Sequence, residues 1–349
     1  MSCIQALQAA LVGVSEAPFK LRIMIYFYKH SQIYATMKND SVAGSFWDLE
    51  RDCEFKFSQE SPFWHLYTDG RKTDMIFSSK NDMVVGMNLM AISALAFPNI
   101  KVYTFELMNN HVHIILKGPR DDCERFFALF KSKLARFFSR NGRTVNLRDF
   151  NCNMIEIATL QALRNEIVYT NRNGFVAIPS CTPYSYPWGA GAFFFNPFLS
   201  ELRSVDFGSL SVREKRAVCH SNKIDLPDDL KVCDGVIMPS SYCCISEAEG
   251  FFRNAHHYFQ CLTRKYEAYS EIAARLHESI FITDEEMYSA VCALCVRSYN
   301  VKHPGHLPAK DKVDMARRMK QTYNASNRQI KNILKLEKDI VDELFPESK

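Results

Sequence analysis

The chain has 349 residues, enough for two or three domains, and its hydrophobic (47%) and charged (23%) fractions are those of an ordinary globular protein. Its formal net charge of +4 excludes a polycation but is compatible with a nucleic-acid partner. The sequence has no signal-peptide pattern and no apolar run as long as a membrane span. We therefore expect an intracellular, cytoplasmic protein with no membrane partner.

The cysteines are expected to be reduced thiols, because nothing in the sequence indicates secretion. Cys292 and Cys295 form a Cys-x-x-Cys pair that is followed by His303 and His306, so a zinc site has to be considered. The gap between the two pairs is shorter than in zinc fingers. Both cysteines also fall in an amphipathic helical pattern, which favours packing in a core.

Residues 1–60 show no pattern that indicates chemistry, and we treat them as an N-terminal extension. In FWHLYTDGRKTDMIF, Asp69-Gly70 separates two β-rich runs, which predicts a hairpin. Asn81 or Asp82 is expected to cap the next helix, which must end before Pro98.

The stretch KVYTFELMNNHVHIILK, residues 101–117, alternates apolar and polar residues with the period of a half-buried strand. Side chains two apart on a strand share a face, so His111 and His113 are expected to project to the same side. Two imidazoles on a rigid strand can hold one divalent metal ion. The pattern alone leaves open the alternative of two surface histidines.

Asp121 and Asp122 are expected to begin a helix that buries a stripe of phenylalanines. A basic segment covers this helix and the residues after it, with no acid before Asp149, and it suits either a solvated face or a DNA-binding surface. Its members are Lys131, Lys133, Arg136, Arg140, Arg143 and Arg148.

The pattern MIEIATLQALRNEIVYTNR, residues 154–172, predicts another helix, ended by Gly174. Tyr169 and Asn173 are four residues apart and therefore share one face of it. Taken alone, Tyr169 is most simply a packing residue. The order strand, helix, strand, helix indicates an α+β fold in which helices cover an antiparallel sheet.

Beyond residue 195 the sequence predicts an all-α C-terminal region, divided into a helical region at 196–305 and a helix-turn-helix-like segment at 306–349. The second has a turn at 323–326 and a helix capped by Ser326 or Asn327. This polarity suits DNA binding, although a plain αα-hairpin fits the pattern nearly as well. The basic residues expected to contact DNA are Arg328, Lys331 and Lys335.

Two motifs carry a resemblance to a known family. MNNHVHIIL is similar to the MPNHVHLLL-type signature of HUH single-strand endonucleases, and IVYTNRNGFV resembles the Tyr-Ile-x-x-Asn-Pro signature of one of their groups. That group is the IS200-like and REP-associated tyrosine transposases, and the resemblance spans about residues 63–190. Asn109 replaces the usual Pro of the first motif, and the usual Pro after Asn173 is missing.

This resemblance implies a ferredoxin-like (RRM-like) sheet with covering helices, the HUH fold, in residues 61–195. It makes Tyr169 the nucleophile and His111, His113 and Asn173 the ligands of Mg²⁺ or Mn²⁺. It implies a bacterial, single-tyrosine DNA transposase, nucleoid-associated when bound, that cuts and rejoins hairpin-flanked single-stranded DNA as a homodimer without a nucleotide cofactor. The alternatives are a domesticated DNA-binding regulator that has lost the chemistry, and an initiator nuclease of replication or conjugation.

Overall fold

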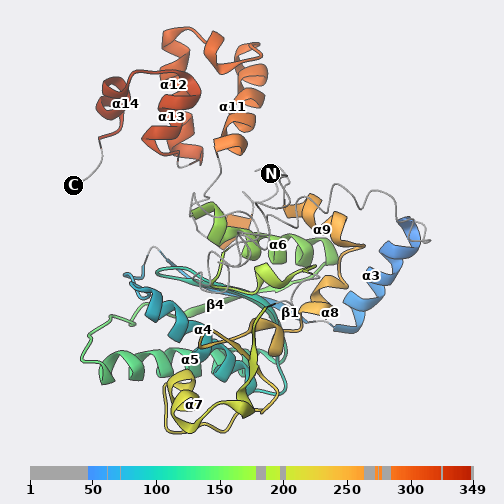
Figure 1. Ribbon diagram of the computed structural model, residues 1–349. Coiled ribbons are helices and arrows are strands. Elements are labelled where there is room, and N and C mark those ends of the chain that lie inside the picture. The colour runs from blue at the N-terminus through green and yellow to red at the C-terminus, as the bar shows by residue number, and fades with distance from the viewer. Residues whose placement is uncertain are drawn as a thin grey trace, which may run out of the picture. The chain divides into compact units, whose positions relative to one another are not determined.

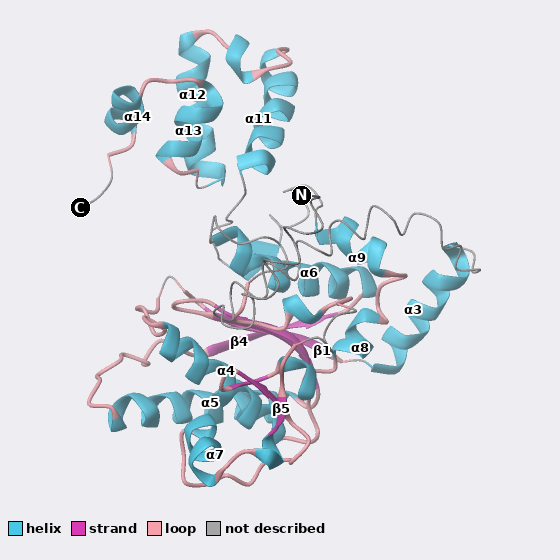
Figure 2. Cartoon of the chain, viewed as in Figure 1, coloured by secondary structure: helices cyan, strands magenta, loops and turns pink. Residues whose placement is uncertain are grey.

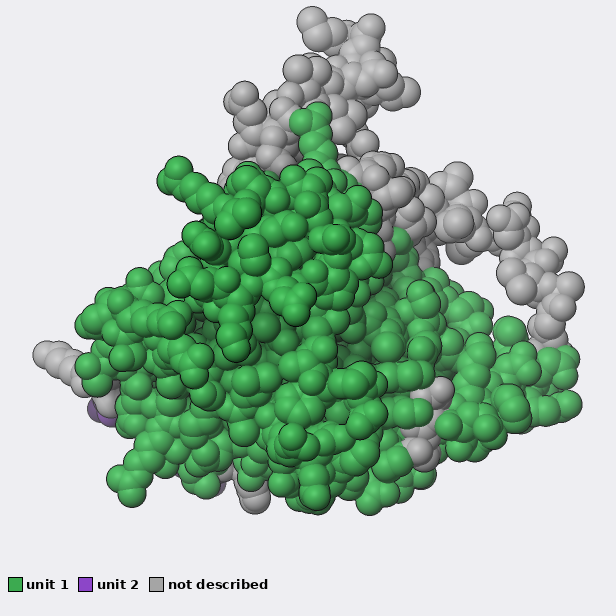
Figure 3. Space-filling model, turned by 90° about the horizontal axis from the view of Figure 1, so that it is seen from below, with its two compact units in different colours: residues 1–262 green, residues 263–349 purple. Residues whose placement is uncertain are grey.

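The computed structural model describes residues 46–60, 62–70, 72–177, 186–196, 202–262, 272–273, 275–276, 284–323 and 325–346. The chain forms two compact units, residues 1–262 and residues 263–349, coloured separately in Figure 3. This boundary falls inside the 196–305 segment that the sequence suggested as one region. Residues 1–45 of the expected N-terminal extension lie outside the described residues.

The first unit is built on a four-stranded antiparallel sheet in the order β2-β3-β1-β4. Its strands are β1 (Phe63–Thr68), β2 (Lys101–Leu107), β3 (Val112–Lys117) and β4 (Cys152–Ile157). β1 and β3 are the interior strands, and every side chain of β1 is buried. The predicted α+β arrangement, with helices covering an antiparallel sheet, is therefore confirmed for this part of the chain.

The stretch expected as one histidine strand is a hairpin of β2 and β3. The turn spans residues 108–111 and is closed by the bond from Met108 N to the His111 carbonyl, at 2.8 Å. His113 lies within β3, whereas His111 precedes the strand. The period-2 alternation continues on both sides of Asn109-Asn110, so it did not reveal the turn between them.

Helices cover both faces of the sheet (Figures 1 and 2). α4 (Lys80–Leu95) and α5 (Arg120–Arg140) lie on one face, and α6 (Leu160–Ala177) and α9 (Ala255–Leu262) lie on the other. α4 begins at Ser79, which forms a capping box with Asp82, so the cap lies earlier than expected. α5 begins with Asp121 and Asp122 in its first turn and buries its phenylalanine stripe, as predicted.

Two predicted boundaries near α6 are wrong. Residues 152–157 form β4, because their backbone pairs with β1, and α6 starts only after Thr159, whose hydroxyl accepts a bond from Ala162 N at 3.1 Å. Gly174 does not end the helix, which continues to Ala177. The ring of Tyr186 lies where a side chain of residue 174 would be, so this glycine serves close packing rather than termination.

The prediction of a hairpin at Asp69-Gly70 is also wrong. Residues after β1 form a turn, in which Lys72 N and the Thr73 hydroxyl both donate to the Asp69 carbonyl. The apolar run that follows is held by the Asn109 carbonyl, which accepts from Ile76 N and Phe77 N. The backbone of this run therefore bonds to the β2–β3 turn instead of returning along β1.

Residues 202–262 contain a small sheet as well as helices, which corrects the expectation of an all-α region. β5 (Val205–Asp206), β6 (Lys231–Cys233) and β7 (Val236–Ile237) form three antiparallel strands, accompanied by α7 (Val212–Cys219) and α8 (Ile245–Glu249). Asn88 of α4 donates to the Gly235 carbonyl in the turn between β6 and β7 and accepts from Ile237 N of β7. α4 is therefore covered on two sides, which explains its nearly continuous apolar sequence.

The described part of the N-terminal extension is α3 (Phe46–Glu60). Glu50 accepts a bidentate pair of bonds from Arg164 of α6, at 2.6 and 3.1 Å. Arg164 is 2% exposed, and its Nε donates to the Phe251 carbonyl at 2.6 Å. α3 is thus attached to the helix that carries Tyr169.

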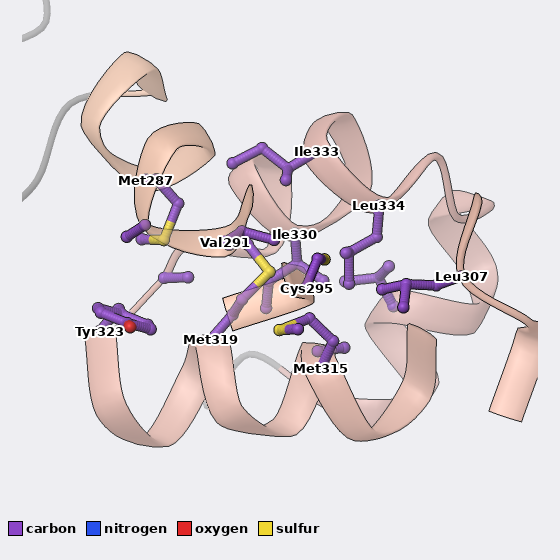
Figure 4. Close-up of a cluster of buried hydrophobic side chains, with 14 residues drawn as sticks. Met287, Val291, Cys295, Leu307, Met315, Met319, Tyr323, Ile330, Ile333 and Leu334 are labelled. Atoms are coloured by element: carbon purple, nitrogen blue, oxygen red, sulfur yellow. The ribbon is translucent and has the colours of Figure 1, made fainter. Parts of the chain in front are cut away.

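The second unit is helical in the ranges that the structure describes. Its helices there include α11 (Asp284–Tyr299), α12 (Ala309–Tyr323), α13 (Asn327–Leu334) and α14 (Lys338–Leu344). They enclose one apolar core, shown in Figure 4, to which α11 contributes Met287, Val291 and Cys295. Ser326 caps α13 through a capping box with Gln329, as predicted.

The cysteines of the described ranges carry free thiols. Cys295 is fully buried in the core of the second unit, which confirms core packing for this residue. Across the described ranges, no helix combines the length and apolar character that a membrane crossing requires.

Candidate active site

The side chains of His111, His113 and Tyr169 meet on the face of the sheet that α6 covers. The ring centroids of His111 and His113 are 5.1 Å apart, with the ring planes at 88°. The ring of Tyr169 lies 5.6 Å from that of His113. Residues separated by more than fifty positions are thus brought together because α6 crosses the central strands.

His113 is held by a chain of hydrogen bonds that runs through the sheet to α6. Its Nδ1 lies 3.0 Å from Nε2 of His65 on β1, and Nδ1 of His65 lies 2.8 Å from Oε2 of Glu166 on α6. All three side chains are buried. Burial, together with the neighbouring His65, holds the pKa of His113 well below its ordinary value, so this imidazole is neutral near pH 7.

His111 is held by the preceding residue. Asn110 Nδ2 donates to the Gly70 carbonyl at 2.7 Å and to the Thr73 carbonyl at 3.4 Å. This leaves Asn110 Oδ1 to accept from His111 Nδ1, at 2.7 Å. Gly70 is also required sterically, since a Cβ there would lie 2.8 Å from His111 Nδ1.

The spacing of the two imidazoles is compatible with a shared divalent ion and equally with an edge-to-face contact between the rings. A metal lies about 2.1 Å from a ligating imidazole nitrogen, so two such rings at adjacent coordination positions have centroids about 4.5–5.2 Å apart. The observed 5.1 Å agrees with this range. Among the described residues no three His, Cys, Asp or Glu side chains are grouped as a metal site. The predicted set contains only two residues of those types, with the Asn173 amide as its third member.

Tyr169 is nearly buried, with 4% of its surface exposed, and Asn173 follows it by one helical turn and is half-buried. The backbone next to Asn173 is fixed by Glu106 of β2, whose Oε2 accepts from Gly174 N at 2.6 Å. Burial raises the pKa of Glu106 well above its ordinary value, although this bond opposes the shift.

A chain segment after α6 supports the same region. Leu107 N donates to the Trp188 carbonyl at 2.8 Å, and Ala190 N donates to the Phe105 carbonyl at 3.0 Å, so residues 188–190 run along the free edge of β2. The Tyr186 hydroxyl donates to the Leu107 carbonyl at 2.6 Å. Tyr186 and Trp188 thereby fix the end of β2 next to the histidine turn.

The predicted basic residues lie away from this cluster. α5 carries Lys131, Lys133, Arg136 and Arg140 on the opposite face of the sheet from α6 (Figure 1). Arg143 forms an ion pair with Asp82, with Nη1 2.5 Å from Oδ1, and Lys131 donates to Asn151 at 2.7 Å. Arg148, Arg136 and Arg140 are exposed, as are the second-unit residues Arg328, Lys331 and Lys335.

Sequence reasoning missed His65, Glu166 and Asn110. His65 is a polar residue in FWHLYT, between aromatic and aliphatic neighbours on a strand that is buried throughout, and that is the signal that could have indicated it. Glu166 precedes Tyr169 by three residues and therefore lies on the same helical face. Asn110 is part of the quoted motif, but its support of His111 depends on the fold of the turn.

Neither a known protein family nor a curated protein matches this chain. Among solved structures, the chain is similar to the structure of a REP-associated tyrosine transposase bound to a REP hairpin. The match has a TM-score of 0.32 and 13% sequence identity, and it covers 40% of this chain and 82% of that chain. A similarity of this degree is a distant structural one and does not define the function.

Proposed function

We propose that this chain is a metal-dependent single-stranded DNA endonuclease and transposase that cleaves and rejoins hairpin-flanked DNA, with Tyr169 as its nucleophile. The observation that carries the proposal is the cluster of one tyrosine and two adjacent histidines, with ring separations of 5.6 and 5.1 Å. The two sequence motifs that hold these residues support it further.

In the proposed reaction, the Tyr169 phenol oxygen attacks the phosphorus of a DNA phosphodiester in line with the leaving oxygen. The new bond joins the 5′ phosphate to Tyr169, and the bond to the 3′ oxygen breaks, so a 3′ hydroxyl is released. The phenol gives its proton to solvent, and the departing 3′ oxygen takes one proton up to become the hydroxyl. A second 3′ hydroxyl reverses the step, and because the linkage conserves the bond energy, no nucleotide cofactor is required.

His111, His113 and Asn173 would hold Mg²⁺ or Mn²⁺ in this proposal, through two imidazole nitrogens and an amide oxygen. A bound divalent ion would polarise the scissile phosphate and stabilise charge on its oxygens. The protein itself keeps both imidazoles side by side. It also holds the ring of Tyr169 with its centroid 5.6 Å from the ring centroid of His113.

DNA binding is proposed for the exposed basic residues of α5 and of the second unit. Each Lys or Arg that neutralises a phosphate adds about 0.7 to the slope of log affinity against log salt concentration for single strands. Replacing Arg136 and Arg140 together by Ala should therefore lower the measured slope by about 1.4. An unchanged slope would remove α5 from the DNA path and leave the second unit as the candidate surface.

The proposed nucleophile is tested by adduct formation. The protein is incubated with labelled hairpin-flanked single strands from the DNA around its gene, in Mn²⁺ or Mg²⁺, and resolved on denaturing gels. We expect a covalent protein–DNA species with wild type and none with Tyr169→Phe, while both bind DNA equally. An adduct with Tyr169→Phe would show that the nucleophile is another residue.

The burial of Tyr169, at 4% exposed, favours a second candidate function, a DNA-binding regulator that keeps the fold without the chemistry. An attacking phenol must reach a phosphate, so α6 has to shift or DNA has to open this face.

By resemblance the protein acts as a homodimer, a state that light scattering measures. Hairpin binding without an adduct at any divalent metal concentration would establish the regulator instead.

A further inference from the structure

In the second unit, α13 carries a row of exposed polar side chains that contains no acid. Arg328, Lys331 and Asn332 lie at helical spacings of three and four residues, so they share one face, and Lys335 follows at the C-cap. We refer to these four residues as the α13 row. The opposite face of the helix is apolar and is buried in the core of the unit, as Figure 4 shows. The row is therefore the outer surface of a helix whose other side is fixed by packing.

A buried amide fixes the orientation of α13 within its unit. The Asn327 side chain is 9% exposed, and its Nδ2 donates to Asp342 Oδ1 at 3.1 Å and to the Phe345 carbonyl at 2.9 Å. Its Oδ1 accepts from Lys320 Nζ of α12 at 3.1 Å. This one side chain thus joins α12, α13 and the end of α14. The α13 row is presented on a rigid support, which a surface that recognises a partner requires.

The segment around the row is basic. Residues 309–335 contain eight lysines and arginines but only two acids, Asp311 and Asp314. The Asp314 carboxylate is already engaged, since it accepts from the Tyr299 hydroxyl at 2.6 Å and lies 3.4 Å from Nε of Arg318. A surface of this charge attracts a polyanion such as nucleic acid.

The shape of this segment favours duplex DNA over a single strand. α12 ends at Tyr323 and α13 begins at Asn327, and a short connection of this kind is typical of helix-turn-helix pairs. α13 is about 12 Å long at 1.5 Å per residue, which matches the roughly 12 Å width of the major groove. Proteins that bind single strands stack the bases on aromatic side chains, and the sequence of α13, NRQIKNIL, has none.

We propose that α12 and α13 form a helix-turn-helix that binds double-stranded DNA in a sequence-dependent way, with the α13 row in the major groove. This inference rests on the proposed function for DNA as the partner, and it names the form of DNA that the second unit takes. The first unit then takes the single strand that is cut, and the second unit takes a duplex.

The side chains of the row divide by their chemistry. Arg328 and Asn332 have planar ends that make paired hydrogen bonds to bases, an arginine to guanine and an asparagine to adenine. They are about 6 Å apart along the helix, a span that reaches neighbouring base pairs. Lys331 and Lys335 end in flexible point charges that suit phosphates. We therefore expect Arg328 and Asn332 to determine the sequence preference and the two lysines to add affinity.

The test uses the full chain with Tyr169→Phe, so that no strand is cut during binding. This protein selects from two pools of DNA with a randomised centre, one double-stranded and one single-stranded, and the bound molecules are sequenced. We expect a sequence to be enriched from the duplex pool. Fluorescence anisotropy then measures the affinity for the enriched duplex and for a scrambled duplex of the same composition over a range of salt concentrations.

Substitutions in the row separate base recognition from phosphate binding. Arg328→Ala and Asn332→Ala should each weaken binding to the enriched duplex about 5–150-fold more than binding to the scrambled duplex. Lys331→Ala should weaken both alike and lower the slope of log affinity against log salt concentration by about 0.9. Arg297→Ala is the matched control, because it removes one positive charge from an exposed residue of α11 and should leave the preference unchanged.

The contrary outcomes are distinct. A duplex pool with no enriched sequence would overturn the inference, and so would an enriched duplex that Arg328→Ala and Asn332→Ala bind as tightly as the parent protein. Enrichment from the single-stranded pool that these two substitutions abolish would overturn it as well, because the row would then bind a single strand. The covalent adduct of the wild-type protein is measured independently. A missing adduct removes the nuclease proposal, whereas a missing duplex preference removes only the role of α13.

Discussion

Replacing Gly70 by Ala tests the position of His111 with a single methyl group. The added Cβ would lie 2.8 Å from His111 Nδ1, 3.1 Å from its Cγ and 3.3 Å from Asn110 Oδ1. Ordinary contact begins at 3.4 Å, so the methyl and the ring must separate by about 0.6 Å. The turn is anchored at the Gly70 carbonyl by Asn110, so we expect the ring to move.

A displacement of about 0.6 Å exceeds the tolerance of roughly 0.2 Å for metal–ligand distances. We therefore expect Gly70→Ala to weaken Mn²⁺ binding at least tenfold, by about 1.4 kcal/mol or more. The overpacking should also lower the free energy of unfolding by about 1–3 kcal/mol. Mn²⁺ titration by electron paramagnetic resonance and urea unfolding measure the two effects separately.

Gly142→Ala is the control for loss of stability alone. Gly142 has φ +66, and no atom lies within 4 Å of the place that a Cβ would take, so Ala there strains the backbone without touching a neighbour. It should cost about 1–2 kcal/mol of stability and leave Mn²⁺ affinity unchanged. Wild-type Mn²⁺ affinity in Gly70→Ala would show that His111 is not a ligand in this geometry.

Three further substitutions test the fold around the site. Burial lowers the pKa of His220 to about 4, so the neutral ring contributes stability above the unfolded pKa of 6.5, and this stability is lost as pH falls towards 4. His220→Asn should therefore reduce the change in the free energy of unfolding between pH 7 and 4.5, measured with urea, by up to about 3 kcal/mol. Asp82→Ala removes the Asp82 half of the capping box and the Arg143 pair, and should cost about 3 kcal/mol in the same assay. Gly174→Ala meets the Tyr186 ring and should lower the melting temperature, whereas adding Tyr186→Ala should remove the extra cost of the methyl in a double-mutant cycle.

The sequence predicted the helices best where a cap and an apolar stripe coincide. Asp121, Asp122 and the phenylalanines defined α5, and Ser326 defined the start of α13. It failed where one local pattern suits two structures. MIEI at 154–157 fits the start of a helix, and only pairing with β1 makes it a strand.

The candidate site was predicted in part for the same reason. His111, His113 and Tyr169 stand out because their types and spacing suit one chemistry, and the fold brings their rings together. His65 and Glu166 are 101 positions apart in the sequence, so their bond depends on the register of β1 and the placement of α6. The sequence shows a glycine at position 70 but not which atoms lie next to it, so the contact between Gly70 and His111 could be found only in the structure.

The central claim is that Tyr169 forms the covalent bond to DNA, and peptide mapping of the adduct tests it most directly. The wild-type adduct is digested with protease and nuclease, and mass spectrometry locates the residue that carries the nucleotide phosphate. We predict that the modification lies on Tyr169, with its 5′ phosphate attached to the phenol oxygen. A nucleotide on any other residue, or no modified peptide under conditions in which the protein binds hairpin DNA, would contradict the account.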